Sequence, residues 1–220
     1  MSWCLGVLVV NKMHKKGFTL VELLVALMVG SIILAAVATL AYALGKVNDA
    51  GNDTSRKQAQ IRFSTIRITE LIRNAKLICG TPTDAIVVWR ADVDSNKKIN
   101  SDELVYIQSN SAGNKIQLIQ YDRPASYNSA ILLADIQSGA AKQSLDSNCK
   151  KTSVDLVPQC SNVSFTVDNS AIPQRSRFAS IKFNITENNT TRKYEICATV
   201  AGPCFNLLSS TNTIVSGDDD

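Results

Sequence analysis

The chain is organised around the stretch Lys15-Lys16-Gly17-Phe18-Thr19-Leu20-Val21-Glu22-Leu23-Leu24-Val25-Ala26-Leu27. From residue 18 to residue 45 every side chain is apolar, small or weakly polar, with Glu22 as the one exception. A helix over residues 18–44 would be roughly 40 Å long at about 1.5 Å per residue. The hydrocarbon core of a bilayer is about 30 Å thick, so the sequence predicts a helix that spans a membrane.

Glu22 stands near the start of this apolar segment. A carboxylate inside a bilayer costs on the order of 2.5 to 3.5 kcal/mol or more unless something neutralises it. An acid in a spanning helix is therefore a functional candidate that needs a cationic partner. The plain alternative is an ordinary membrane anchor that carries a stray acid.

The segment Lys16-Gly17-Phe18-Thr19-Leu20-Val21-Glu22 resembles the cleavage and methylation site of type IV prepilins and type II secretion pseudopilins. Members of that family have a basic leader that ends in Gly, an aromatic first mature residue and Glu as the fifth mature residue. These positions are matched in turn by Lys15, Lys16, Gly17, Phe18 and Glu22. The resemblance covers roughly residues 13–78.

The resemblance implies processing by a membrane prepilin peptidase, which would cut after Gly17 and methylate the new amine of Phe18. It also implies that Glu22 pairs with the charged N-terminal amine of a neighbouring subunit in a filament. Such a pair offsets the desolvation that each charge would suffer alone. The implied partners are the prepilin peptidase, other pilins or pseudopilins, the assembly platform of the bacterial inner membrane, and membrane lipid.

The net charge of the chain comes from its leader, residues 1–17. The whole chain has 23 Lys and Arg against 19 Asp and Glu, and the leader holds three lysines and no acid, which leaves 20 basic against 19 acidic residues. A mature chain so close to neutral argues against nucleic acid as a partner. The leader lysines place the N-terminus in the cytoplasm, so the rest of the protein is expected on the outer side of the inner membrane.

The leader offers two candidate start sites, Met1 and Met13. Residues 3–10 are apolar but too few to span a bilayer, whereas a start at Met13 would leave a compact basic leader of the kind this family often shows. The only histidine, His14, also lies in the leader. A mature chain without imidazole excludes Ser-His and Cys-His nucleophiles and His-ligated zinc, and we expect no enzyme.

Beyond residue 45 we expect the helix to continue to residue 79 and to end at Gly80 and Thr81-Pro82. Residues 46–55 are rich in Gly, Asn and Asp, which lowers helix propensity and favours a bend, or else a linker before a separate helix. An apolar stripe with helical spacing follows and should lie against a sheet: Ile61, Ile68, Leu71, Ile72, Ala75 and Ile78.

Short β-branched segments between turn residues predict strands over 85–90, 104–108, 115–121, 162–167, 178–186 and 191–200, with Asn188-Asn189 as a hairpin turn. Within residues 124–150, the segment 127–136 fits either a short helix or a strand. The expected fold is α+β and pilin-like: a long N-terminal helical spine, with its apolar half in the membrane, and an antiparallel β-rich head over residues 80–220.

Residues 92–103 carry oxygen-bearing side chains at the first, third, fifth, ninth and twelfth positions, with Ile99 apolar at the eighth. This spacing resembles the EF-hand calcium loop. The match assigns side-chain oxygens to Asp92, Asp94 and Asn96, a carbonyl to Lys98, a direct or water-mediated contact to Asn100, and two oxygens to Glu103.

The sixth position of this loop departs from the pattern, because Lys97 stands where Gly is usual. A positive φ at Lys97 would cost about 1 kcal/mol or more. The flanking segments are predicted strands, so the loop would cap a hairpin. We expect a structural calcium ion, and the alternative is a solvated hairpin loop rich in Asp and Asn.

Five cysteines remain once Cys4 leaves with the leader: Cys79, Cys149, Cys160, Cys197 and Cys204. An exported domain lies where disulfides persist. Short local separations favour the pairs Cys197–Cys204 and Cys149–Cys160, which leaves Cys79 unpaired.

These features together predict a minor type IV pilin or type II secretion pseudopilin, a structural and assembly subunit of a periplasmic or extracellular filament. One alternative is a major pilin. Another is a pilus-tip adhesin or DNA-binding subunit, which would need an exposed basic or aromatic patch. The candidates for that patch are Arg175, Arg177, Lys182, Arg192 and Lys193.

Overall fold

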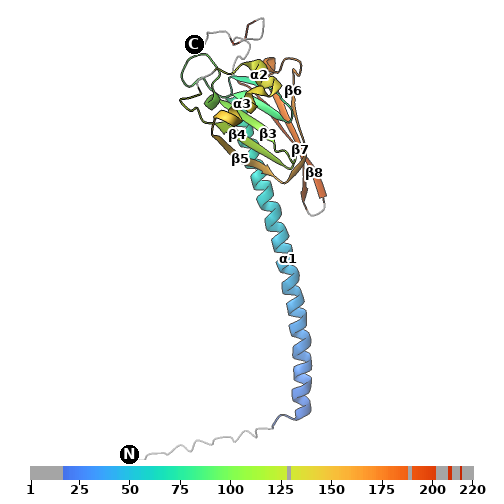
Figure 1. The fold of residues 1–220 in the computed structure, drawn as a ribbon. Helices are drawn as coiled ribbons and strands as arrows, with labels where there is room; N and C mark the ends of the chain where they lie inside the picture. The colour runs from blue at the N-terminus through green and yellow to red at the C-terminus, as the bar shows by residue number, and fades with distance from the viewer. Residues whose placement is uncertain (1–16, 128–129, 188–189, 202–207, 210–213, 215–220) are drawn as a thin grey trace, which may run out of the picture. The chain divides into compact units, whose positions relative to one another are not determined.

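A computed structural model describes residues 17–127, 130–187, 190–201, 208–209 and 214 (Figure 1). The chain separates into two compact units, the first ending at Gly51 and the second beginning at Asn52. The elements in chain order are α1 (Leu20–Arg73), β1 (Leu77–Gly80), β2 (Ala85–Trp89), β3 (Leu104–Ser109), β4 (Lys115–Tyr121), α2 (Leu133–Ser138), α3 (Ala140–Asn148), β5 (Lys151–Pro158), β6 (Cys160–Val167), β7 (Phe178–Glu187) and β8 (Thr190–Thr199).

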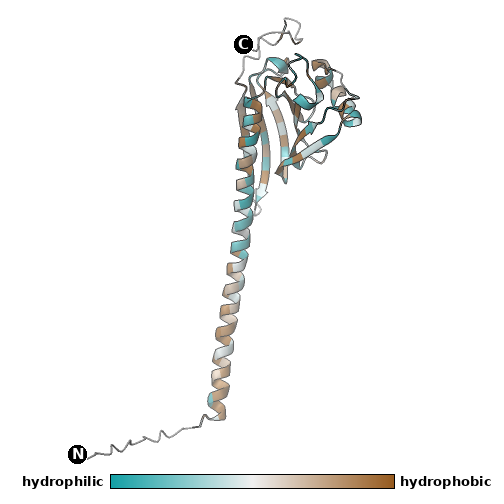
Figure 2. Cartoon of the chain, turned by 90° about the vertical axis from the view of Figure 1, so that its left-hand side faces the viewer, coloured by the Kyte–Doolittle hydropathy of each residue, from teal (hydrophilic) through white to brown (hydrophobic). Residues whose placement is uncertain are grey.

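Helix α1 is unbroken from Leu20 to Arg73, so the alternative of a separate helix after a linker at 46–55 is wrong. Its apolar first part is exposed and is long and apolar enough to cross a membrane. Figure 2 shows the change along α1 from apolar residues in brown to polar residues in teal. In the polar part, Lys57 pairs with Asp53 one turn earlier at 2.8 Å, an arrangement that supports a helix.

The helix ends at Arg73, earlier than the predicted end at residue 79. The N–H of Lys76 donates to the carbonyl of Trp89 at 2.8 Å, and β1 then pairs antiparallel with β2. Ile78 therefore lies on a strand opposite Val88, whereas the rest of the predicted stripe is buried on α1 or just after it. The spacing of Ile78 fits a helix, but pairing with β2 decides its structure.

The strands form two antiparallel sheets, one with the order β1-β2-β3-β4-β5 and one with the order β6-β7-β8. The six predicted strands correspond to β2, β3, β4, β6, β7 and β8. Strands β1 and β5 were not predicted. The predicted turn Asn188-Asn189 lies outside the described residues, although the flanking residues Glu187 and Thr190 are paired.

The five-stranded sheet is covered on both faces in the second unit. On one face, alternate residues such as Ile86 and Val88 pack with the buried stripe of α1 and with the three-stranded sheet. On the other face, Val87 and Trp89 pack with α2, α3 and the segment around Ile99 and Ile131. Every residue of β2 is buried, because successive side chains point to opposite faces of the sheet and both faces are covered. The fold is α+β, as predicted.

The ambiguous segment 124–150 contains two short helices, α2 and α3. Gly139 ends α2 and precedes α3 with φ of 81°, in the left-handed region that favours glycine. Leu133, Ile136, Ala141 and Leu145 are the buried residues of these helices, and all four belong to the cluster beneath the sheet.

Candidate functional sites

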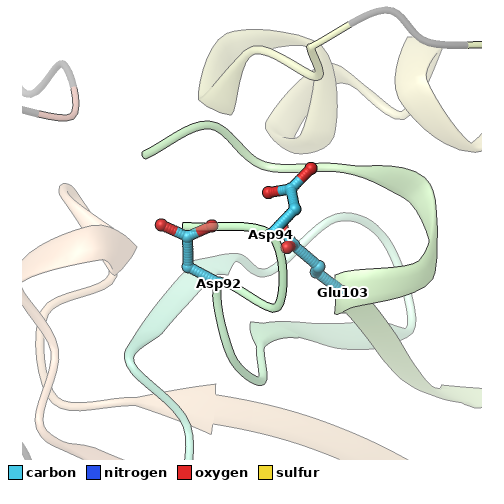
Figure 3. Close-up of side chains that lie close together, drawn as sticks. All are labelled: Asp92, Asp94 and Glu103. Atoms are coloured by element: carbon cyan, nitrogen blue, oxygen red, sulfur yellow. The ribbon is translucent and has the colours of Figure 1, made fainter. Parts of the chain in front are cut away.

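The loop between β2 and β3 brings three carboxylates together. One oxygen from each of Asp92, Asp94 and Glu103 lies within 4.8 Å of the others, and Figure 3 shows these side chains converging. Both ends of the loop are fixed, because Trp89 and Leu104 are cross-strand partners. Two ligands of one calcium ion, each at about 2.3 to 2.6 Å, lie at most about 5 Å apart, so this spacing suits such an ion.

Glu103 is fully buried at the end of this loop. One of its carboxylate oxygens accepts a hydrogen bond from the N–H of Val93 at 2.7 Å, and the other accepts from Trp89 Nε1 at 3.2 Å and from the N–H of Asn100 at 3.1 Å. A buried charge is costly unless it is paired and hydrogen-bonded. These neutral donors offset part of that cost and hold the carboxylate in one orientation.

Asp92 organises the first half of the loop. Its two oxygens accept hydrogen bonds from the N–H groups of Asn96 at 3.1 Å and Lys97 at 2.9 Å. The chain curls around this carboxylate through positive φ values of 53° at Ser95 and 60° at Lys97. Lys97, at the sixth loop position, thus has a left-handed backbone in which glycine would be less strained.

Asp94 is held by Arg123, which sequence reasoning missed. The two side chains form an ion pair at 2.5 Å, and the hydrogen bond from the guanidinium holds the pKa of Asp94 below its usual range. The amide nitrogens of Asn96 and Asn100 also donate to Asp94, at 2.7 Å and 3.3 Å. Arg123 follows β4. The only sequence signal for its contact with Asp94 was the expected pairing of β3 with β4, which brings their ends together.

The structure thus gathers five of the six predicted ligands by their side chains: Asp92, Asp94, Asn96, Asn100 and Glu103. For Lys98, the predicted ligand was the backbone carbonyl; its N–H donates to Asn96 Oδ1 at 2.7 Å. Oxygen-rich, charged donor sets of this kind suit hard cations, so the residues fit a calcium ion.

At the other end of the chain, Gly17 and Phe18 precede α1 and are exposed. Thr19 and Glu22 form a capping box, in which the Thr19 N–H donates to Glu22 Oε2 at 3.1 Å and the Glu22 N–H donates to Thr19 Oγ1 at 3.3 Å. The Thr19 hydroxyl also donates to Glu22 Oε2 at 3.2 Å. Glu22 therefore caps its own helix, a role that the spacing Thr-x-x-Glu could have revealed.

A family model for the prokaryotic N-terminal methylation motif matches residues 12–38. The chain carries this methylation motif. The motif is the hallmark of type IV prepilin-like and pseudopilin-like proteins, and it supports a pilin-like or pseudopilin-like subunit in general. Comparison with curated proteins and with solved structures found no match.

The predicted pair Cys149–Cys160 is wrong, because both are free thiols. Strand β5 separates them and carries the chain roughly 26 Å at about 3.3 Å per residue, whereas a disulfide needs Cα atoms within about 7 Å. Cys149 packs on the α2–α3 side of the sheet, and Cys160 packs on the opposite side. Cys204 lies outside the described residues, so the pair Cys197–Cys204 stays a prediction.

The positive charge of the basic residues considered for an adhesin patch is partly compensated by neighbouring acids. Lys182 on β7 pairs with Glu195 on β8 at 3.5 Å, and these two residues are direct cross-strand partners. Such a pair reduces the positive charge that this face of the sheet could offer to a polyanion.

Proposed function

We propose that this chain is a minor subunit of a type IV pilus or of a type II secretion pseudopilus. The observation that carries the proposal is the methylation motif at residues 12–38, which runs directly into an apolar helix able to span a membrane. A prepilin peptidase cuts after Gly17 and methylates Phe18. The anchored subunit has a cytoplasmic N-terminus and an exported head, and it enters the filament through the inner-membrane assembly platform.

In the proposed filament, the Glu22 carboxylate pairs with the methylated amine of a neighbouring subunit. Within one chain Glu22 already accepts two hydrogen bonds from Thr19. These bonds reduce the cost of holding the acid in the membrane before assembly, whereas only a cation neutralises its charge. Assembly therefore supplies the missing interaction and sets the axial position of the subunit.

The substitution Glu22→Gln separates these two roles. The amide oxygen of Gln still accepts from Thr19, but the negative charge is lost, so the variant should insert and be processed yet be scarce in sheared filaments. The matched control is Thr19→Ala, which removes the capping hydroxyl and keeps the charge, and which should assemble better than Glu22→Gln. Normal filament incorporation of Glu22→Gln would overturn the role proposed for the charge.

Processing has its own test. Intact mass analysis should show that protein from cells with active prepilin peptidase has lost the leader and gained one methyl group, relative to protein from cells without the peptidase. Retention of residues up to Gly17 in cells with active peptidase would contradict the proposal. A major-subunit role predicts instead that this chain is the dominant species in sheared filaments.

We also propose that the loop at 92–103 binds one structural calcium ion. Asp92, Asp94 and the buried Glu103 would supply carboxylate oxygens, and the two loop asparagines would turn their amide oxygens toward the ion. Isothermal calorimetry of the full chain in detergent should show calcium binding that Asp92→Asn weakens strongly. Asp84→Asn, a change in another loop, is the matched control. An absence of calcium heat together with an unchanged melting temperature in calcium would refute this site.

A further inference from the structure

Both carboxylate oxygens of Asp94 are surrounded by donors. Oδ2 accepts hydrogen bonds from Arg123 Nη1 at 2.5 Å, from Asn96 Nδ2 at 2.7 Å and from Asn100 Nδ2 at 3.3 Å. Oδ1 accepts from the Asn96 N–H and from Asn100 Nδ2, both at 3.3 Å. Each oxygen offers about two lone-pair positions, so the donors fill the places that a metal ion would use. Calcium binding by Asp94 therefore requires that donors move away.

The side-chain donors to Asp94 differ in how they can respond to an ion. An asparagine can turn its amide over and present an oxygen in place of the nitrogen, so Asn96 and Asn100 can change from donors into ligands. An arginine has only donors and keeps its charge at any ordinary pH. Arg123 is therefore the one of these three side chains that calcium has to displace from Asp94.

The backbone holds Arg123 beside the loop. The N–H of the preceding residue, Asp122, donates to the carbonyl of Lys150 at 3.0 Å, and the Asp122 carbonyl accepts from Ser101 Oγ at 3.3 Å. The side chains of Arg123 and Asp94 are only 26% and 34% exposed. A cation tethered in this way competes with a dissolved ion at an effective concentration of about the millimolar range.

The charge of the loop favours a cation at this position. Four negative and two positive side chains give residues 92–103 a formal charge of −2: Asp92, Asp94, Asp102 and Glu103 against Lys97 and Lys98. The charges of Asp102 and Glu103 act on Arg123 in addition to that of Asp94. Arg123 brings the charge of this group to −1, which weakens its attraction for a divalent cation.

We propose that Arg123 is an internal competitor of calcium at this loop and lowers the affinity of the site about tenfold. This inference rests on the calcium site proposed above and concerns its regulation. At low calcium the guanidinium holds Asp94, and the loop keeps its shape. As calcium rises, the ion takes the place of the guanidinium on Asp94, so one cation is exchanged for another.

Isothermal calorimetry of the full chain in detergent tests the competition through the calcium dissociation constant. Arg123→Gln removes the charge and should bind calcium about tenfold more tightly than wild type. Arg123→Lys keeps the charge and should stay closer to wild type. The matched control is Arg90→Gln, which removes an exposed arginine that forms no ion pair in the described part of the chain. This control should leave the affinity nearly unchanged.

The outcomes separate the competitor from the site. Equal or weaker binding by Arg123→Gln, while wild type binds calcium, would overturn the competitor and leave the site intact. An equal gain in Arg90→Gln would also overturn the competitor, because any nearby positive charge would then have the same effect. Binding by Arg123→Gln alone would support both. An absence of binding in both wild type and Arg123→Gln would overturn the site and the competitor together.

Arginine modification tests the exchange without measuring affinity. Phenylglyoxal labels guanidinium groups, and a bound carboxylate protects them, so saturating calcium should raise the labelling rate of Arg123 several-fold. The rate at Arg90 should not change, and peptide mass spectrometry over a time course measures both sites. In a chain that calorimetry shows to bind calcium, an unchanged rate at Arg123 would overturn the exchange.

Discussion

The indole Nε1 of Trp89 donates a hydrogen bond to the buried carboxylate of Glu103 at 3.2 Å. Trp89 would be the one tryptophan of the mature chain, since the other, Trp3, lies in the leader. A cation bound by Glu103 would withdraw electron density from the oxygen that accepts this bond. Calcium titration of the mature protein should therefore change Trp89 fluorescence.

Replacing Glu103 by Gln should abolish that fluorescence change. The amide nitrogen of Gln would meet N–H donors where a carboxylate oxygen stood, and a buried donor without a partner costs about 1 to 3 kcal/mol in unfolding free energy. Glu195→Gln, an exposed change on β8, should leave both fluorescence and stability nearly unchanged. A full calcium response in Glu103→Gln would contradict the assigned ligand.

Lys97→Gly should stabilise the protein by roughly 0.5 to 1 kcal/mol, because glycine adopts the φ of 60° found there without steric cost. Chemical denaturation of the full chain in calcium-free detergent buffer measures this effect. Lys98→Gly is the matched control: its backbone is outside the positive-φ region, so glycine should be neutral or destabilising there. Equal effects of the two substitutions would show that backbone strain at Lys97 is unimportant.

The sequence predicts an element of this fold well where the interactions that determine the element lie close together along the chain. Strand β4 matches its predicted bounds at Lys115 and Tyr121, because its apolar run stands between turn residues. Strand β5 was missed because its first five residues are exposed at the edge of the sheet and are mostly polar. The end of α1 was misplaced because the periodicity of Ala75 and Ile78 suits a helix, while pairing with β2 is a long-range effect.

The same distinction between local and long-range interactions applies to the candidate sites. The cluster of loop side chains could be predicted because its members lie within twelve consecutive residues, and the methylation motif could be predicted because it is a continuous segment. Arg123 was missed because it reaches Asp94 only through the pairing of β3 with β4. The Cys149–Cys160 pair failed because short sequence separation was taken for closeness, whereas the intervening residues form an extended strand.

The contribution of Asp94 to stability should depend on pH in a defined direction. The hydrogen bond from Arg123 lowers the pKa of Asp94 in the folded state, so the carboxylate stabilises the fold fully above its unfolded pKa of about 4. The stabilisation is lost as the pH falls through the lower folded pKa. In calcium-free buffer, the stability difference between wild type and Asp94→Asn should be constant above about pH 5 and shrink below about pH 4. A difference that grows on acidification would contradict this sign.

The described thiols should differ in reactivity toward maleimide. Burial raises the pKa of the Cys79 thiol, and burial also raises the pKa of Cys149 and Cys160, whereas Cys197 is exposed on β8. In protein that has been reduced beforehand, so that Cys197 is a thiol whether or not it pairs with Cys204, Cys197 should be labelled at least about tenfold faster than Cys79 at pH 7.5, because the thiolate is the reactive form. Peptide mass spectrometry over a time course measures each site. Equal labelling rates of Cys197 and Cys79 in the folded protein would show that burial does not control their reactivity.

The exposed apolar residues of α1 in the second unit predict a contact between neighbouring heads in the proposed filament. Phe63 and Ile66 are 66% and 59% exposed, and with Val154 on the edge strand β5 they line one groove of about 360 Å³. Because Phe63 is exposed, Phe63→Ser should change the unfolding free energy by less than about 0.5 kcal/mol. It should nevertheless reduce incorporation into sheared filaments several-fold, since apolar groove surface would no longer be covered on assembly. Arg62→Ser, at the neighbouring exposed position, is the matched control. Equal incorporation of both variants would mean that this groove stays exposed in the filament.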